Sequence, residues 1–313
     1  MKILVTGGCG YKGSILIPKL LKKNHKVISI DTQWFGNFLP RHKNLKNIKM
    51  NVNNINNISL KGVNTIIHLA SIANDPMAEL NKNISWETSA LGTFRLINHA
   101  IKYKVKRIIY ASSGSVYGIK SNLKVHENLS LEPISLYNKV KMITERVLLS
   151  FNQKIDIFIV RPATVCGYSP RMRFDVSVNA LTISALRKKI ITVFGGKQIR
   201  PNIHIDDITD LYLFFLKINK KYAGIYNAGF ENSSIMEIAK EVVSRTGAKI
   251  KVKKDKNDPR SYRLDSSKLT NIGFKPKKKY ADAISEIQEL YLQKKLKDHP
   301  SFHSVKWLKR KFK

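Results

Sequence analysis

The fold is decided by residues 2–13, KILVTGGCGYKG. Residues 2–6 are mainly apolar or β-branched, which is typical of a buried parallel strand. From Ser14 to Leu21 the apolar residues recur at helical spacing, so the pattern predicts a strand, a glycine loop and a helix in that order. In such a junction the loop and the N-terminus of the helix present backbone N–H groups to phosphate.

Three glycines of this loop have separate tasks in a dinucleotide site. Gly7 permits the tight turn, Gly10 lets a pyrophosphate approach the backbone, and Gly13 lets the helix pack against the strand. A second apolar strand, Val27 to Ile30, ends at Asp31, about 20 residues beyond the loop, where a carboxylate binds the ribose hydroxyls and repels a 2′-phosphate. The pattern therefore predicts NAD rather than NADP. The alternative is a structural glycine turn with Asp31 capping the next loop.

Composition is that of a globular protein with an unusual charge. The 313 residues suggest about two domains, and 43% are hydrophobic. Fifty-six Lys and Arg against 22 Asp and Glu give a net charge of +34, which would attract nucleic acid or an anionic membrane. Lysine is spread over every segment without an aromatic recognition motif, so we expect no specific nucleic-acid partner.

Cysteine usage and hydropathy predict a cytoplasmic protein. Cys9 and Cys166 lie far apart and do not indicate a disulfide framework. No apolar run approaches 18 residues, and no signal peptide precedes the first strand. No metal site is predicted.

Two further strand ends carry candidate cofactor residues. A third strand, Ile48 to Met50, is followed by Asn51 and Val52, where a side-chain amide could contact adenine. A fourth strand beginning at Thr65 ends in Leu69, Ala70 and Ser71, small enough at the end to let a cofactor lie across it. A long helix is predicted from about Ile84 to Tyr103.

Candidate catalytic residues follow a fifth strand, Arg107 to Ala111. It leads into SSGSVYG at 112–118, and the carboxyl ends of parallel strands are where ligands bind. Tyr137 and Lys141 share one face of a helix predicted from Leu136 to Phe151. A tyrosine has a pKa of about 10, and an ammonium at about 4 Å supplies roughly the 4 kcal/mol needed to bring it near 7. Lys141 would therefore activate Tyr137 as a base, while Ser113 binds the substrate oxygen.

These motifs together resemble the extended short-chain dehydrogenase/reductase family and, within it, the NAD-dependent epimerase/dehydratase group that acts on nucleotide sugars. The resemblance runs from Met1 to about Leu296. The matching elements are TGGCGYKG at 6–13, Asp31, HLA at 68–70, LGT at 91–93, SSGSVYG at 112–118, YNKVK at 137–141, RPATV at 161–165, VFGG at 193–196, RPNIHIDD at 200–207 and IGFKP at 272–276. Three positions depart from the family pattern: Asn51, Ser89 and Thr164.

The resemblance implies an α/β fold, a Rossmann-type doubly wound parallel sheet with a smaller C-terminal α+β substrate-binding domain. We expect residues 1–165 to form the NAD-binding domain, with 200–230 returning to it, residues 166–296 the substrate-binding part, and 297–313 a basic tail. The implied catalytic residues are Ser113, Tyr137 and Lys141. The implied cofactor contacts are Gly7, Gly10, Tyr11, Lys12, Gly13, Asp31, Asn51, Val52, Leu69, Ala70, Ser71, Ser112, Tyr137, Lys141 and Pro162.

Arginines in the second half indicate a substrate that carries a diphosphate, because a guanidinium binds phosphate oxygens through two parallel hydrogen bonds. The expected substrate contacts are Ser113, Ser115, Thr164, Arg173, Arg200 and Arg260. Arg171, Arg173 and Arg263 are weighed evenly between substrate binding and surface or structural ion pairs. Asp206 and Asp207 are expected to cap a helix from Ile208 to Leu216.

The resemblance leaves several functions open. A nucleotide-sugar epimerase acting at C4 through a transient 4-keto sugar is favoured, and a nucleotide-sugar dehydrogenase or ketoreductase of a deoxysugar or heptose pathway is the alternative. A 4,6-dehydratase is less favoured, because Gly114 and Ser115 stand where that branch has an Asp-Glu pair. A non-catalytic RNA-binding relative is disfavoured by the intact catalytic set.

Two expectations concern partners of the whole chain. The family resemblance suggests a homodimer through the helices at 84–103 and 136–151. In the tail, Val305, Leu308 and Phe312 lie at helical spacing, so the tail could rest weakly on an anionic membrane. A frayed or self-packed tail is the favoured alternative.

Overall fold

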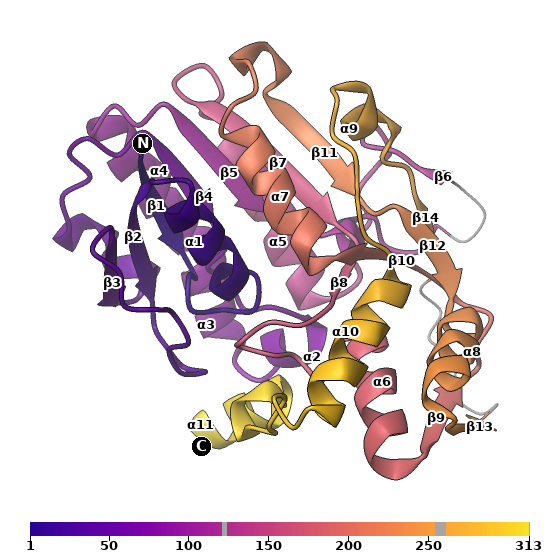
Figure 1. Ribbon diagram of the computed structural model, residues 1–313. Helices are drawn as coiled ribbons and strands as arrows, with labels where there is room; N and C mark the ends of the chain where they lie inside the picture. Colours follow the sequence, from indigo (N-terminus) through magenta and orange to yellow (C-terminus); the bar gives the residue numbers. More distant parts are fainter. Residues whose placement is uncertain (121–123, 254–260, 313) are drawn as a thin grey trace.

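A parallel sheet forms the centre of the computed structural model, which describes residues 1–120, 124–253 and 261–312 (Figure 1). The sheet has seven strands in the order β11-β7-β5-β4-β1-β2-β3. Their bounds are β1 (Lys2–Thr6), β2 (Lys26–Asp31), β3 (Leu45–Lys49), β4 (Thr65–His68), β5 (Arg107–Ala111), β7 (Asp156–Pro162) and β11 (Gly224–Ala228). The strand order reverses between β1 and β4, which opens a crevice at their carboxyl ends. The predicted doubly wound Rossmann-type sheet is confirmed.

Both faces of this sheet are buried. Alternate residues of β1 belong to different cores: Ile3 and Val5 to one, and Leu4 to the other. Helices α1 (Gly13–Lys22) and α7 (Ile205–Phe215) contact each other, and so do α4 (Gly92–Lys102) and α5 (Leu136–Leu149). A sheet covered on both faces needs apolar residues at successive positions, which is why its strands read as continuous apolar runs.

The second half of the chain builds a smaller α+β part. Its strands form a three-stranded sheet, β12-β10-β8, and a two-stranded sheet, β13-β9. The strands are β8 (Thr164–Cys166), β9 (Ile190–Phe194), β10 (Ile199–His204), β12 (Glu231–Ser234) and β13 (Lys249–Lys253), packed with α6 (Ser177–Lys188), α8 (Ile235–Thr246) and α10 (Tyr280–Leu292). A short pair joins β6 (Lys124–Val125) to β14 (Arg263–Leu264), and α9 (Ser267–Asn271) lies against β11. The exact division into domains stays a prediction.

The helix predicted from Ile84 to Tyr103 is wrong as a single element. The structure has α3 (Lys82–Trp86), a π-helical turn η2 (Glu87–Leu91) and then α4. A Cβ on Gly92, the first residue of α4, would lie 2.8 Å from Val52 Cγ1, so the chain passes very close to the 3₁₀ helix η1 (Val52–Asn57) there. The π turn directly precedes this close contact, and such turns are common at functional sites.

Three smaller predictions of element bounds are also wrong. Helix α7 begins at Ile205, and its N-cap is His204, whose Nδ1 accepts from the backbone N–H of Asp206 at 3.1 Å. Asp206 and Asp207 therefore lie in the first turn and do not cap the helix. Helix α10 ends at Leu292 rather than near residue 296, and β3 begins at Leu45, before the predicted start at residue 48.

The C-terminal tail packs on the protein itself. After η5 (Pro300–Phe302), helix α11 (Ser304–Lys311) lies against α2 (Asp75–Ala78), near the N-terminal half of the chain (Figure 1). Leu308 is buried there, with Val305 and Phe312 partly buried beside it. The sequence left open whether these apolar residues contact a membrane or belong to a frayed or self-packed tail. In the structure they pack on the protein itself. Among the described residues, no helix is long and apolar enough to cross a membrane.

Candidate active site

A cavity of about 830 Å³ lies at the carboxyl ends of the central strands and extends between the two parts of the chain. Every predicted site residue that the structure describes lines it, including all the expected cofactor contacts and Ser113, Ser115, Thr164, Arg173 and Arg200. Arg260 lies outside the described residues. These positions agree with the expected site, while the individual roles stay predictions.

The glycine loop leaves backbone where a dinucleotide needs it. A Cβ on Gly13 would lie 2.3 Å from the carbonyl oxygen of Gly8, and one on Gly7 would lie 2.7 Å from the backbone nitrogen of Ala70. Gly7 also has a φ of +71°, which side chains other than glycine rarely adopt. The loop therefore packs against the end of β4 and the start of α1 as closely as a pyrophosphate cradle requires.

The acid at the end of β2 is held by two backbone donors. Asp31 Oδ2 accepts from the N–H of Cys9 at 3.0 Å, and Oδ1 accepts from the N–H of Gln33 at 2.7 Å. Burial raises the pKa of Asp31, while these two hydrogen bonds oppose the rise. Asn51, expected to contact adenine, uses its Oδ1 to accept from the N–H of Asn53 at 3.0 Å. The carboxylate is thus fixed at the cavity wall, in the place expected for the adenosine ribose.

The structure brings the three candidate catalytic residues together. Ser115 Oγ donates to Asn138 Oδ1 at 2.6 Å, so Ser113 donates its hydroxyl proton to Ser115 across 2.7 Å. Ser113 and Tyr137 line the same cavity. Lys141 Nζ donates to the carbonyl oxygen of Ala111 at 2.8 Å and lies 5.9 Å from the centre of the Tyr137 ring. Phenol, ammonium and hydroxyl therefore share one wall of the cavity.

The electrostatics of Tyr137 differ from the expectation. Burial raises the pKa of Tyr137 above its ordinary value, and the hydrogen bond with Ser113 and the positive charge of Arg173 oppose the rise. Burial lowers the pKa of Lys141 well below its ordinary value, and the nearby ammonium of Lys12 lowers it further. Burial therefore dominates the pKa of both groups in the protein alone, and the activation of Tyr137 by Lys141 stays a prediction.

A buried ion pair below the catalytic residues was not foreseen. Arg161 Nη2 contacts Glu145 Oε2 at 2.6 Å, and both side chains are almost fully buried. Ser112 donates to the same carboxylate, and Arg161 Nη1 donates to Tyr117 Oη at 2.7 Å. The sequence did hold a signal, because Glu145 follows Lys141 by four residues and so shares its helix face. This carboxylate opposes the effect of burial on the Lys141 pKa.

Two arginines of the loop after β8 line the cavity in different ways. Arg173 forms two hydrogen bonds with Asp175, Nε to Oδ1 at 3.0 Å and Nη2 to Oδ2 at 2.8 Å. Asp175 also accepts from Asn74 Nδ2 at 2.9 Å. Arg171 is 3% exposed, and its guanidinium carbon lies 4.0 Å from the centre of the Phe35 ring. Arg171 thus contacts the segment after Asp31, on the dinucleotide side of the cavity.

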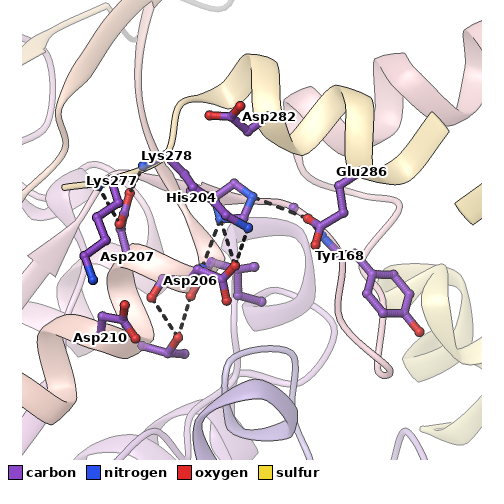
Figure 2. A network of polar contacts seen from close by, with 12 residues as sticks. Tyr168, His204, Asp206, Asp207, Asp210, Lys277, Lys278, Asp282 and Glu286 are labelled. Atoms are coloured by element: carbon purple, nitrogen blue, oxygen red, sulfur yellow. Dashed lines mark hydrogen bonds and ion pairs between the residues drawn. The ribbon is translucent and has the colours of Figure 1, made fainter. Parts of the chain in front are cut away.

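A second polar network contacts the loop after β8 through Tyr168 (Figure 2). Figure 2 shows His204 between Asp206 and Glu286. Glu286 Oε2 lies 3.4 Å from His204 Nε2 and accepts from the N–H of Tyr168 at 3.2 Å. Asp207 accepts from the N–H groups of Lys277 and Lys278. The network therefore joins β10, α7 and α10 to the loop that carries both arginines.

Comparison with known proteins decides the family. The model of the NAD dependent epimerase/dehydratase family matches residues 3–229, most of the chain. The chain belongs to this family. As a member it is an NAD-dependent enzyme, in agreement with the glycine cradle and the carboxylate at the end of β2.

Relatives and solved structures extend the comparison over almost the whole chain. An uncharacterised UDP-glucose epimerase of Bacillus subtilis is 36% identical over 222 residues, covering 66% of this chain and 70% of its own length. UDP-glucose 4-epimerase of Lactobacillus helveticus is 24% identical over 91% of this chain and 94% of its own. The structure of UDP-glucose 4-epimerase from Thermotoga maritima with UDP-glucose has a TM-score of 0.84, with 25% identity, and the match covers 94% of this chain and 99% of that one.

Proposed function

We propose that this family member is a nucleotide-sugar 4-epimerase that uses tightly held NAD. The observation that carries the proposal is the shared wall of the cavity, where Ser113, Tyr137 and Lys141 face the glycine cradle. The cavity volume of about 830 Å³ lies within the usual range of small-molecule and cofactor sites. The similarity to named UDP-glucose epimerases over most of the chain supports the same activity.

In this proposal the chain's own residues bind, orient and move one proton. Bound NAD supplies a reversible hydride acceptor for the sugar carbon. The cofactor would be held by the glycine loop at 7–13, by Asp31 at the adenosine ribose and by Lys141. Tyr137 takes the proton of the 4-hydroxyl and returns it, and Ser113 holds that oxygen within reach of the phenol.

The substrate diphosphate is assigned to the arginine side of the cavity. Arg200 lines the cavity from β10, and Thr164 lies on the adjacent strand β8. Arg173 has Asp175 as a partner and is positively charged beside Tyr137, so it serves both the substrate phosphates and the phenol. A guanidinium in such a place stabilises the negative charge that develops on the phenol oxygen.

A dehydrogenase or ketoreductase on the same substrates is the second candidate. It would share every contact above and differ only in releasing the cofactor after one turnover. A dehydratase is disfavoured, because Ser115 beside Ser113 is engaged with Asn138 and offers no acid for the 6-hydroxyl.

The test is an assay of the purified protein on UDP-glucose and other nucleotide sugars without added cofactor. We expect interconversion of C4 epimers, with the NAD content unchanged after many turnovers. Release of NADH in proportion to oxidised sugar would reject the epimerase in favour of the dehydrogenase. The Tyr137→Phe protein serves as the control for contaminating activity.

We also propose that the protein works as a homodimer in the cytoplasm. Helices α4 and α5 contact each other, and with the preceding η2 they leave large apolar side chains exposed, namely Leu91, Phe94 and Ile143. Exposed apolar side chains on neighbouring helices are what a second copy of the chain would cover.

A further inference from the structure

We propose that residues 299–312 form a C-terminal clasp that closes the dinucleotide side of the cavity and slows the release of NAD. This inference rests on the NAD site of the proposed function. It assigns a binding role to a segment beyond the family match, which ends at residue 229. The clasp comprises η5 and α11 (Figure 1).

The clasp contributes directly to the cavity wall. Ser304, Val305 and Leu308 line the same cavity as Asp31 and the glycine loop. Leu308 is fully buried in a small apolar cluster with Ile72 and Met77, which follow β4. The helix therefore lies over the cofactor side of the site rather than at a remote surface.

Two hydrogen bonds hold the clasp to segments that also line the cavity or adjoin its lining residues. Trp307 Nε1 donates to the carbonyl oxygen of Trp34 at 2.6 Å, which ties α11 to the segment just after Asp31. At η5, the N–H of Phe174 donates to the carbonyl oxygen of Phe302 at 3.0 Å. The clasp thus bridges the adenosine side of the cavity and the loop that carries the arginines.

Arg171 links the clasp to the expected phosphate of the cofactor. Its Nη2 donates to Ser304 Oγ at 3.0 Å, and its guanidinium lies over the Phe35 ring. Its buried Nε has no hydrogen-bond partner among the residues that the structure describes. The guanidinium of Arg171 lines the cavity, where its positive charge would attract a phosphate group of the cofactor.

A segment bound on three sides must detach before a cofactor beneath it leaves. Closing elements of this kind change dissociation more than association, and they suit an enzyme that regenerates its cofactor in every cycle. The basic side chains Lys306, Lys309, Arg310 and Lys311 remain exposed on the outer face, so they do not account for the closure.

The test measures release of NADH by stopped-flow fluorescence, with excess NAD as competitor. The decisive variant is Trp307→Phe, which keeps an aromatic ring at this position and removes the indole N–H that donates to Trp34. We expect NADH to dissociate roughly threefold to tenfold faster from it, the range that loss of one hydrogen bond gives. A chain ending at His303 should release NADH faster still, while Lys309→Gln, an exposed change on the same helix, should leave the rate unaltered.

Unfolding temperatures measured without ligand show whether each variant keeps its fold. If the shortened chain does not fold, Trp307→Phe and Ser304→Ala decide the matter. Unchanged NADH release from folded Trp307→Phe and Ser304→Ala proteins overturns the clasp. If the variants release NADH faster but the wild-type protein epimerises no sugar, the clasp is supported and the proposed function is rejected. If the wild-type protein epimerises sugar but the variants release NADH at the wild-type rate, the proposed function is supported and the clasp is rejected.

Discussion

At the scale of single residues, the site depends on buried charges that satisfy one another. Glu145 and Arg161 are both buried below the catalytic wall, and Ser112, the neighbour of Ser113, donates to the same carboxylate. Lys141 lies one helical turn before Glu145. The ion pair thereby joins β7 to the helix that carries Tyr137, and the hydrogen bond from Ser112 joins that helix to the end of β5.

Changing Tyr137 to Phe removes the group that takes the proton. We expect turnover to fall by roughly 10²–10⁴-fold, the usual contribution of a general base. The ring stays in place, so affinity for NAD should change little. Steady-state kinetics and calorimetric titration with NAD measure the two quantities, and a variant that retained near-normal turnover would remove Tyr137 from the catalytic role.

Changing Glu145 to Gln leaves Arg161 buried without its countercharge. We expect a loss of about 3–5 kcal/mol in the free energy of unfolding, as is usual when one partner of a buried pair is removed. Asp156→Asn is the matched control, because it breaks the more exposed pair with Arg107 and should cost less than about 1 kcal/mol. Urea denaturation measures the free energy of unfolding of both variants. Equal losses would contradict the claim that the buried Glu145 pair contributes more to stability than the more exposed Asp156 pair.

At the scale of elements, the junction of β1 and α1 must allow close packing of the helix and close approach of a ligand. Different glycines meet these two requirements. Gly13 allows α1 to start against the backbone of Gly8, which concerns folding. Gly10 has only the carbonyl oxygen of Gly7 near its missing Cβ, at 3.2 Å, so its freedom serves the approach of a ligand instead.

Alanine at these two positions should therefore have different effects. Gly13→Ala places a methyl group 2.3 Å from the Gly8 oxygen. We expect this change to lower the free energy of unfolding by roughly 1–3 kcal/mol and to abolish NAD binding. Gly10→Ala should leave the unfolding temperature nearly unchanged and weaken NAD binding. Calorimetric unfolding and NAD titration separate the two outcomes, and an unstable Gly10→Ala protein would refute this division.

The start of α7 is stabilised by charge in a manner that depends on pH. Burial alone would raise the pKa of Asp206, but hydrogen bonds and charges from Lys278 and Lys19 lower it from 3.8 to about 2. Because the folded pKa lies below the unfolded one, the stabilisation is present above about pH 4 and is lost as pH falls towards 2. Asp206→Asn should cost about 1–2 kcal/mol at pH 6 and progressively less below pH 4. Urea denaturation at pH 6 and below pH 4 tests the direction of this pH dependence. The control is Asp210→Asn, because Asp210 pairs with Lys19.

At the scale of the whole molecule, the site exists only where the two parts of the chain meet. The chain leaves the large sheet after β7, builds β8, α6, β9 and β10, and returns to that sheet with β11. The loop after β8 thereby carries Arg171 and Arg173 to the cavity wall opposite the glycine cradle. The outer faces of α4 and α5 carry the surface that we propose for a second copy.

Disrupting the proposed dimer tests that face. Phe94 is 49% exposed on α4, and Phe94→Glu should convert the dimer to monomers, because a charge would be buried without a partner. Leu292→Glu, at an exposed apolar residue of α10, should leave the mass unchanged. Light scattering coupled to gel filtration measures both, and a wild-type protein that is monomeric at micromolar concentration would reject the proposal.

The local signals of the sequence determined the family, the sheet and most of the candidate site. The glycine loop and Asp31 belong to one strand, loop, helix and strand unit, so their spacing along the chain already implies their proximity. The pair Tyr137 and Lys141 is likewise set by one helical turn. Parallel strands that are buried on both faces consist of continuous apolar runs. The ends of these runs in the sequence therefore predicted where the strands end.

Only the tertiary structure decided which distant groups meet. The Glu145 and Arg161 pair, the network of His204 with Glu286, and the clasp with Trp34 join residues from separate elements, and no periodicity encodes such contacts. The raised pKa of Tyr137 likewise results from burial by the folded chain rather than from the helical spacing to Lys141. Local periodicity specifies elements because backbone geometry repeats, whereas desolvation and long-range pairing depend on the packing of the complete fold.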